Sequence, residues 1–303
     1  MNKQLIIQWI KNLNTRKLIF KSSIACISFL ITIFQLINLT CLDFSNIWLS
    51  LCVMMGISLI LAVIINRPKT SFQYKLKDRD IWIKIKIWDI TSEKNIIIPI
   101  NDQFDVSQAC IKESPWSVLS SIINKYYNWK SELLWNDIKL WIKGQKPKKI
   151  WNGNFWLWEI IKVRTCNHNF YLLSNTHIWK RWHSFSWDGE FFGTLYYLFD
   201  NLFINSDSSE RIAIPLLNTR HSGSAKLTKK VVLESIIENF ITYSKDKKIC
   251  EKLTIYIYPK DFNDGTINRE EIQKFTEYHA VTHFNKSNED INAQHLWWEP
   301  LTK

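Results

Sequence analysis

Residues 95–105 read NIIIPINDQFD, and this stretch sets the fold class. Four isoleucines and a proline follow one another from residue 96 to residue 100, and the polar turn NDQFD comes next. A short apolar run that ends in a turn is typical of a strand buried on both faces, as in a parallel sheet. We therefore predict a fully buried strand over residues 95–101.

Strand and helix patterns alternate on both sides of this run. Isoleucine alternates with more polar positions over residues 81–87, which predicts a strand with one buried face, and two β-rich runs around the turn CNHN predict a hairpin over residues 155–178. Further strands are predicted at residues 211–217 and 252–259, and helices at residues 115–128, 189–203, 227–245 and 269–279. Strands alternating with helices predict an α/β sandwich with a mixed sheet.

Two uncharged apolar runs precede this region, at residues 22–42 and 47–65. Each is long enough to cross a hydrocarbon core of roughly 30 Å, so we predict an N-terminal transmembrane α-helical hairpin. A cleaved signal peptide is the alternative for the first run, but the run is too long, lacks a small-x-small cleavage site and is followed at once by the second. The predicted domains are a membrane hairpin at residues 1–69 and a domain at residues 70–303, with a Trp-rich insertion at about 129–158.

The basic residues give this hairpin an orientation. Ten of them flank the two runs on their outer sides: Lys3, Lys11, Arg16, Lys17, Lys21, Arg67, Lys69, Lys75, Lys77 and Arg79. Because positive charge favours the cytoplasmic side, we expect a multi-pass protein of the inner (plasma) membrane with both termini cytoplasmic. The formal net charge of +11 is partly explained in this way.

The cysteines do not suggest a metal or disulfide site. None of the six forms a CxxC pair or has metal-ligand spacing with histidine, which fits a main domain kept in a reducing compartment. We predict no metal and no cofactor.

Three polar loops follow predicted strands, where open α/β sheets bind ligands. They are WDITS at residues 88–92, PINDQFD at residues 99–105 and LLNTRHSGSAK at residues 216–226. The third loop is small and polar and opens a helix, so its backbone N–H groups and the helix dipole predict an anion nest, although it contains neither a Walker A motif nor GxGxxG. The alternatives are that Asp89 only caps a turn and that Arg220 and Lys226 are a solvated surface pair.

The order of these segments resembles a known family. A strand ending in WDI, then IIIPINDQFD, FYLLSNTHI and IAIPLLNTRHSGSAKLTKKVVLESII, after two apolar runs, is similar to the macro-domain branch of the Thoeris antiphage defence effectors, the membrane form of the ThsA type. The resemblance covers roughly residues 20 to 260. It implies that the α/β region is a macro-like domain, a fold that binds ADP-ribose.

The resemblance also assigns roles to residues. It implies that Asp89 accepts a hydrogen bond from the adenine amino group and that Asn101 lies near the distal ribose. Adenine also needs an apolar face, for which Trp88, Ile90 and Phe104 are the candidates. The ligand-binding set it predicts is Asp89, Ile90, Asn101, Asp102, Phe104, Asp105, Leu217, Asn218, Thr219, Arg220, His221, Ser222 and Gly223, the last six forming the diphosphate loop. Trp88 and Ile98 depart from the family pattern, which has Gly and Asn at these positions, and the second departure favours binding over turnover; we assign no catalytic residue.

These features imply an effector of antiphage defence that senses an ADP-ribose derivative. The signal would be made from NAD by a TIR-domain enzyme as functional partner, for example as a histidine conjugate, and binding would promote homo-oligomer assembly and membrane disruption. One alternative is a membrane-held ADP-ribosyl hydrolase, in which Asp102, Asp105 or His221 activates water. Another is a nucleic-acid binder that uses the Trp and Lys residues of 129–158, although we expect no nucleic acid because membrane orientation explains much of the charge.

Overall fold

The computed structural model describes residues 13–38, 47–65, 70–77, 79–87, 89–107, 117–147, 154–165, 167–178, 184–217, 227–259 and 267–282. The chain divides into two compact units, Met1–Thr70 and Ser71–Lys303. Each unit is described separately below.

Among its described residues, the first unit has the helices α2 (Leu13–Asn38) and α3 (Ile47–Ile65), which contact each other. The predicted transmembrane hairpin is contradicted, because no helix within the described residues is long and apolar enough to cross a bilayer. A crossing needs about 20 consecutive apolar residues, whereas α2 includes the charged Lys17 and Lys21. The predicted multi-pass location in the inner membrane is contradicted with it.

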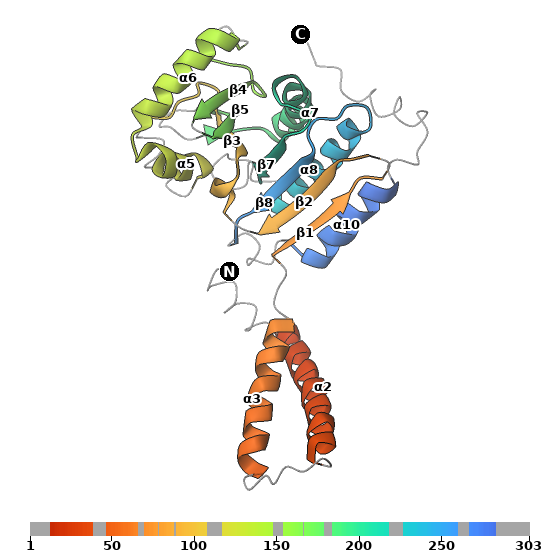
Figure 1. The fold of residues 1–303 in the computed structure, drawn as a ribbon. Helices are drawn as coiled ribbons and strands as arrows, with labels where there is room; N and C mark the ends of the chain where they lie inside the picture. The colour runs from red at the N-terminus through yellow and green to blue at the C-terminus, as the bar shows by residue number, and fades with distance from the viewer. Residues whose placement is uncertain are drawn as a thin grey trace. The chain divides into compact units, whose positions relative to one another are not determined.

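The second unit is built on one mixed sheet. Seven strands follow the order β1-β2-β8-β7-β3-β5-β4, and β6 pairs with β5 (Figure 1). The strands are β1 (Ser71–Lys75), β2 (Trp82–Ile87), β3 (Asn95–Asn101), β4 (Ile160–Thr165), β5 (His168–Ile178), β6 (Ser184–Phe185), β7 (Arg211–Pro215) and β8 (Lys252–Ile257). The five inner strands β2, β8, β7, β3 and β5 are parallel, and β1 and β4 run antiparallel at the two edges.

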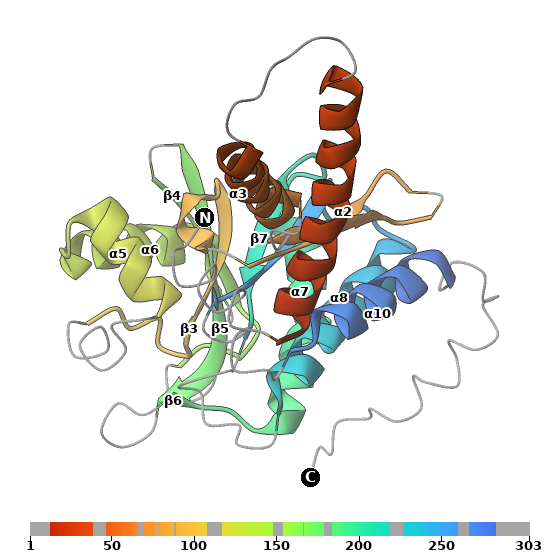
Figure 2. The same cartoon turned by 90° about the horizontal axis from the view of Figure 1, so that it is seen from below.

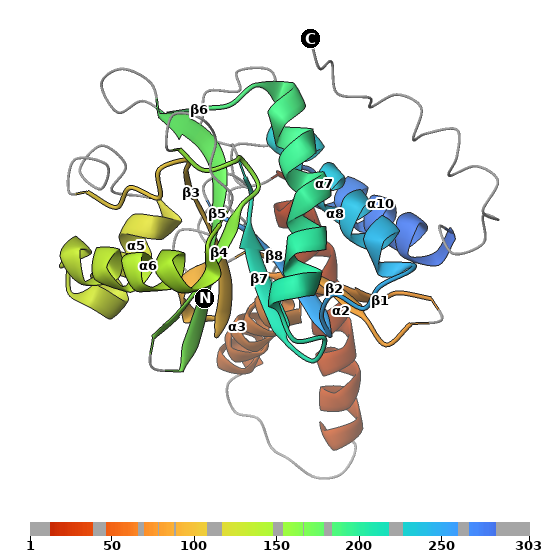
Figure 3. The same cartoon turned by 90° about the horizontal axis from the view of Figure 1, so that it is seen from above.

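Helices cover both faces of this sheet, as the predicted sandwich requires. α5 (Val118–Tyr127) and α6 (Ser131–Gln145) lie on one side, and α7 (Asp188–Asn205), α8 (Lys229–Ser244) and α10 (Arg269–Thr282) lie on the other (Figures 2 and 3). α6 lies within the Trp-rich segment, and its Trp135 and Trp141 pack against the core that α5 and α6 share with the sheet. Core packing therefore accounts for two of the tryptophans that suggested base stacking.

Strand β3 has the predicted bounds and is buried on both faces. Ile96, Ile98 and Ile100 belong to the core under α5 and α6, and Ile97, which points to the opposite face, is also fully buried. Because successive side chains of a strand point to opposite faces, only a strand covered on both sides makes a continuous apolar run favourable.

The predicted hairpin is present, but its first strand is shorter than predicted. β4 begins at Ile160, because Trp158 has a left-handed backbone with φ 74° and its N–H donates to the carbonyl of Ser174 at 2.6 Å. The residues before Ile160 therefore form a turn rather than an extended strand. The edge strand β1, whose sequence SFQYK has little apolar character, was not predicted.

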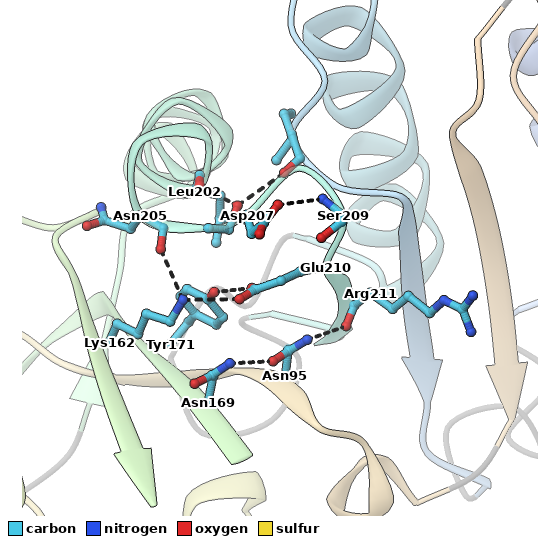
Figure 4. Close-up of polar contacts among 12 residues, drawn as sticks. Asn95, Lys162, Asn169, Tyr171, Leu202, Asn205, Asp207, Ser209, Glu210 and Arg211 are labelled. Carbon is cyan, nitrogen blue, oxygen red and sulfur yellow. Dashed lines mark hydrogen bonds and ion pairs between the residues drawn. The ribbon is translucent and has the colours of Figure 1, made fainter. Parts of the chain in front are cut away.

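A largely buried ion pair joins β4 to the segment between α7 and β7 (Figure 4). The Nζ atom of Lys162 lies 3.2 Å from Glu210 Oε1 and 3.3 Å from the carbonyl oxygen of Asn205, and the Tyr171 hydroxyl donates to Glu210. Burial, and then the hydrogen bond to Glu210, raise the pKa of Tyr171, so the phenol remains a donor. Removing one partner would leave the other charge buried without its counterion.

We expect Lys162→Met to lower the free energy of unfolding by about 3 kcal/mol, since it leaves the Glu210 carboxylate unpaired in a buried site. The double variant Lys162→Met with Glu210→Gln should lose less than the sum of the two single variants, because neither charge then remains. Urea denaturation of the four proteins measures this coupling. Arg211→Ala is the control, because Arg211 pairs with Glu251 at the surface and exposed pairs contribute about 0 to 1 kcal/mol; additive losses for Lys162 and Glu210 would contradict the prediction.

Candidate functional site

The carboxyl ends of the five parallel strands lie at one edge of the sheet. This edge brings together three predicted loops: the segment from Asp89, the turn that follows Asn101 and the chain after Pro215. β3 and β7 are paired only at Asn95–Ile212 and Ile96–Ala213, so the carboxyl halves of the two strands are not paired with each other. Pro99 in β3 and Pro215 in β7 each lack an N–H, which reduces the donors available to extend this pairing.

The chain leaves β3 and β7 in opposite directions. β3 leads to α5 and α6 on one face of the sheet, whereas β7 leads to α8 on the other (Figure 3). In open α/β sheets, ligands bind outside the carboxyl ends of the strands at such a topological switch point. We therefore place the candidate site at the edge between the loops that follow β2, β3 and β7.

Asp89 is an exposed acceptor at this edge. It is the N-cap of η1 (Ile90–Ser92), where Asp89 Oδ1 accepts from Thr91 N–H at 2.9 Å and Oδ2 accepts from the Thr91 hydroxyl at 2.8 Å. The carbonyl of Thr91 accepts in turn from Lys125 Nζ and from the Tyr126 hydroxyl, both at 2.7 Å, which fixes the turn. The capping alternative is therefore observed, but a carboxylate has about four acceptor positions, so Asp89 can also accept from a ligand.

A second group of polar side chains lies near Asp89. The Tyr256 hydroxyl donates to Glu93, and Lys86 Nζ donates to the Tyr256 hydroxyl at 2.9 Å. Burial, and then the hydrogen bond and charge of Glu93, raise the pKa of Tyr256, and the charge of Asp89 adds to this. This end of the site therefore combines the Lys86–Glu93 ion pair with a phenol that stays protonated.

The Asn101 side chain organises the turn after β3. Its Oδ1 accepts from the N–H groups of Gln103 at 3.1 Å and Asp105 at 2.9 Å, and its Nδ2 donates to the carbonyl of Asp105 at 3.3 Å. Phe104 has φ 53°, a left-handed conformation that is uncommon for a bulky residue, and its ring is fully buried against Phe155. Asn101 thus holds a strained turn, of the kind found at ligand sites.

The Asp102 side chain anchors the same turn to β5 and to Asn154. Its side chain is buried and accepts from His177 Nδ1 at 2.8 Å, from Asn154 Nδ2 at 3.1 Å and from Ile178 N–H at 3.3 Å. The other ring nitrogen of His177 lies 3.0 Å from Glu190 in the first turn of α7. A chain of polar contacts therefore connects the ends of β3 and β5 to the start of α7.

The remaining predicted site residues divide into three groups. Ile90 and Leu217 are buried and, like Phe104, belong to the interior rather than to an exposed wall. Asp105 accepts from both the N–H and the hydroxyl of Ser107. The other predicted residues lie outside the described residues: Asn218, Thr219, Arg220, His221, Ser222 and Gly223.

Sequence reasoning missed His177, Glu190 and Asn154. The signal was present in part, because His177 is the penultimate residue of β5, and β5 is parallel to β3. The end of FYLLSNTHI therefore belongs to the same edge as NDQFD. The predicted hairpin fixed the direction of β5 only relative to β4. Among the residues that the structure describes, no group of three His, Cys, Asp or Glu side chains is arranged to hold a metal ion.

The strand order and the polar carboxyl edge define an open α/β domain with a candidate ligand site at its topological switch point. The family profile described as "Thoeris protein ThsA, Macro domain" matches residues 83–258, and the chain belongs to this family. This confirms the predicted resemblance to the ThsA-type macro domain, and the macro-like α/β domain with a mixed sheet.

Solved macrodomains show distant similarity. An Oceanobacillus iheyensis macrodomain variant with ADPR has a TM-score of 0.47 and 14% identity, with 68% of this chain and 99% of that chain covered. The same macrodomain with ADP gives 0.45 and 13%, covering 69% and 99%. The macro domain of ganglioside induced differentiation associated protein 2 gives 0.39 and 10%, covering 64% and 83%. A search of curated proteins gives no match.

We expect Asn101→Ala to destabilise the second unit by about 1 to 3 kcal/mol, because it removes the acceptor of two backbone N–H groups in a buried turn. Gln103→Ala in the same turn is the control, since Gln103 is exposed and should change stability by less than about 0.5 kcal/mol. Chemical denaturation followed by tryptophan fluorescence measures both variants. Equal stability of Asn101→Ala and the unmodified chain would show that the turn does not depend on this side chain.

Proposed function

We propose that the second unit binds an ADP-ribose derivative at the carboxyl edge of its sheet, as the sensing part of an antiphage defence effector. The observation that carries this proposal is the position of Asp89, a fixed and exposed carboxylate beside the switch point between β3 and β7. Adenine presents an exocyclic amino group, and a carboxylate is a strong acceptor for such a donor. In this proposal Asp89 accepts from that amino group, and the turn after Asn101 lies near the distal ribose.

The charge of the loop after β7 suits the centre of such a ligand. A diphosphate carries about two negative charges, and the loop contributes Arg220 and Lys226 before α8 begins. α8 starts at Lys229, with Thr228 as its N-cap. The free N–H groups and positive dipole end of a helix start favour anions.

The polar contacts of the turn favour binding over turnover. An ADP-ribosyl hydrolase needs a group near the distal ribose that can activate water, and Asp102 and Asp105 were the nominated carboxylates among the described residues. Asp102 is buried and accepts three hydrogen bonds, and Asp105 accepts two from Ser107. The carboxylate of Asp102 is therefore committed to holding the fold of the edge, which supports a role in recognition.

The proposed signal is made from NAD by a TIR-domain enzyme, and a histidine conjugate of ADP-ribose is one form of it. Binding would then favour self-association of the chain, because a ligand shifts any equilibrium by its differential affinity for the two states. If the ligand binds the assembled form about a hundred-fold more tightly than the free form, it shifts the assembly equilibrium by about 2.7 kcal/mol. Since the predicted membrane hairpin is contradicted, the proposal includes no step at a membrane.

We expect the full chain to bind ADP-ribose, and Asp89→Ser to weaken binding by about ten- to a hundred-fold, the loss of a charged hydrogen bond of 1.5 to 3 kcal/mol. Serine retains an N-cap oxygen, so the thermal midpoint should change little. Isothermal titration calorimetry and thermal unfolding on the same samples separate these two roles of Asp89. Gly223→Glu, which adds a negative charge to the diphosphate loop, should weaken binding without touching Asp89.

A ligand with altered chemistry sharpens the test. Inosine diphosphate ribose has a carbonyl oxygen in place of the adenine amino group, so the unmodified chain should prefer ADP-ribose and Asp89→Asn should reduce that preference. Equal affinity of the unmodified chain for both ligands would show that Asp89 does not read the amino group. Absence of binding to ADP-ribose and to its histidine conjugate would contradict the proposed function, and release of ADP-ribose from a modified protein would favour the hydrolase.

A further inference from the structure

Asp102, His177 and Glu190, here named the His177 cluster, come from three different parts of the second unit. Asp102 follows β3, His177 is near the end of β5, and Glu190 lies in the first turn of α7. His177 Nδ1 is 2.8 Å from Asp102 Oδ2, and His177 Nε2 is 3.0 Å from Glu190 Oε1. The other carboxylate oxygen of Glu190 accepts from Trp187 N–H at 2.8 Å, so Glu190 also holds the start of the helix.

The geometry requires two protons on the imidazole. A carboxylate can only accept, and a neutral histidine has a single N–H. Contacts of 2.8 and 3.0 Å to two carboxylates therefore define an imidazolium that donates from both nitrogens. The hydrogen bonds to Asp102 and then to Glu190 raise the pKa of His177 to about 9, against the opposing effect of burial.

Loss of one proton would affect the two carboxylates differently. The side chain of Asp102 is 2% exposed and that of Glu190 is 28% exposed. A neutral His177 would still donate its single N–H to Asp102, because the buried Asp102 carboxylate cannot be hydrated in place of that hydrogen bond. Its Nε2 lone pair would then face the carboxylate of Glu190, which can separate from it and be hydrated.

We propose that the His177 cluster is a proton-dependent clasp that holds the first turn of α7 against the turn carrying Asn101, and that closing this clasp sets the ligand affinity of the edge. His177 and Glu190 are positioning residues, since they act through the turn that Asp102 anchors. Among the described residues, the charged groups that face His177 are Asp102 and Glu190, and the amide of Asn154 donates to the same Asp102 oxygen, Oδ2, that His177 contacts. The link to affinity rests on the proposed binding of an ADP-ribose derivative.

The upward shift of the His177 pKa determines how the stability of the clasp depends on pH. Since the pKa of His177 is raised above its usual 6.5 to about 9, the clasp contributes fully below about pH 6.5 and is lost as the pH rises through 9. If the closed form then falls to about one tenth of the molecules, the apparent Kd for ADP-ribose rises about ten-fold.

The experiment is calorimetric titration of the full chain with ADP-ribose between pH 7 and pH 10. Glu190→Gln is the matched variant, because its amide can still accept from Trp187 N–H and can donate to a neutral His177. We expect the unmodified chain to lose about ten-fold in affinity across this range, Glu190→Gln to retain its affinity throughout, and His177→Ala to bind weakly at every pH. A flat profile for the unmodified chain, or an equal fall in Glu190→Gln, would overturn the proposal.

A second measurement keeps the clasp testable without the ligand. Hydrogen exchange at pH 7 should show lower protection of the amides of Trp187 and Phe191, which donate to Glu190 and to the Trp187 carbonyl, in His177→Ala than in the unmodified chain, with the amides of β3 unaffected. If ADP-ribose does not bind but this local loss is seen, the proposed function fails and the mechanical part of the clasp stands. If protection is unchanged, the clasp itself is overturned, whatever the outcome of the titration.

Discussion

The parallel pairing of β3 between β5 and β7 is the constraint on which the rest of the structure depends. It directs the carboxyl ends of these strands to one edge, so residues far apart in the sequence meet there. β3 satisfies this constraint because its isoleucines are buried on both faces of a sheet that has α5 and α6 on one side and α7, α8 and α10 on the other (Figures 2 and 3). The pairing with β7 ends after two residues, and the loops that follow the two strands diverge at the point where ligands bind in this fold class.

The polar groups at this edge are fixed by the protein before any ligand arrives. The Asn101 side chain accepts from two backbone N–H groups of the turn, the Asp102 carboxylate accepts from three donors, and Asp89 caps η1. Such arrangements lower the ordering cost of binding, because the loops are held in one conformation. Asp89 differs from the other two in being exposed, so it is the member of this set that is free to contact solvent or a ligand with its remaining acceptor positions.

The sequence predicted the elements whose patterns are local. β3 was predicted with its observed bounds because a strand buried on both faces has a distinctive apolar run, and helices α5, α7, α8 and α10 were predicted within a few residues of their observed bounds. Edge strand β1 and the late start of β4 were missed, since the first has little apolar character and the second depends on the left-handed Trp158. The contact between His177 and Asp102 depends on which strands are neighbours, which no local pattern specifies. Length and apolarity suggested a membrane hairpin that the described residues contradict.

The central claim is that the carboxyl edge holds an ADP-ribose derivative with its adenine at Asp89. A crystal structure of the full chain with ADP-ribose tests it most directly. The account predicts the adenine amino group within about 3 Å of a carboxylate oxygen of Asp89, the diphosphate at the start of α8 and the distal ribose beside the turn of Asn101. A ligand bound elsewhere, or bound at this edge with its adenine away from Asp89, would contradict it.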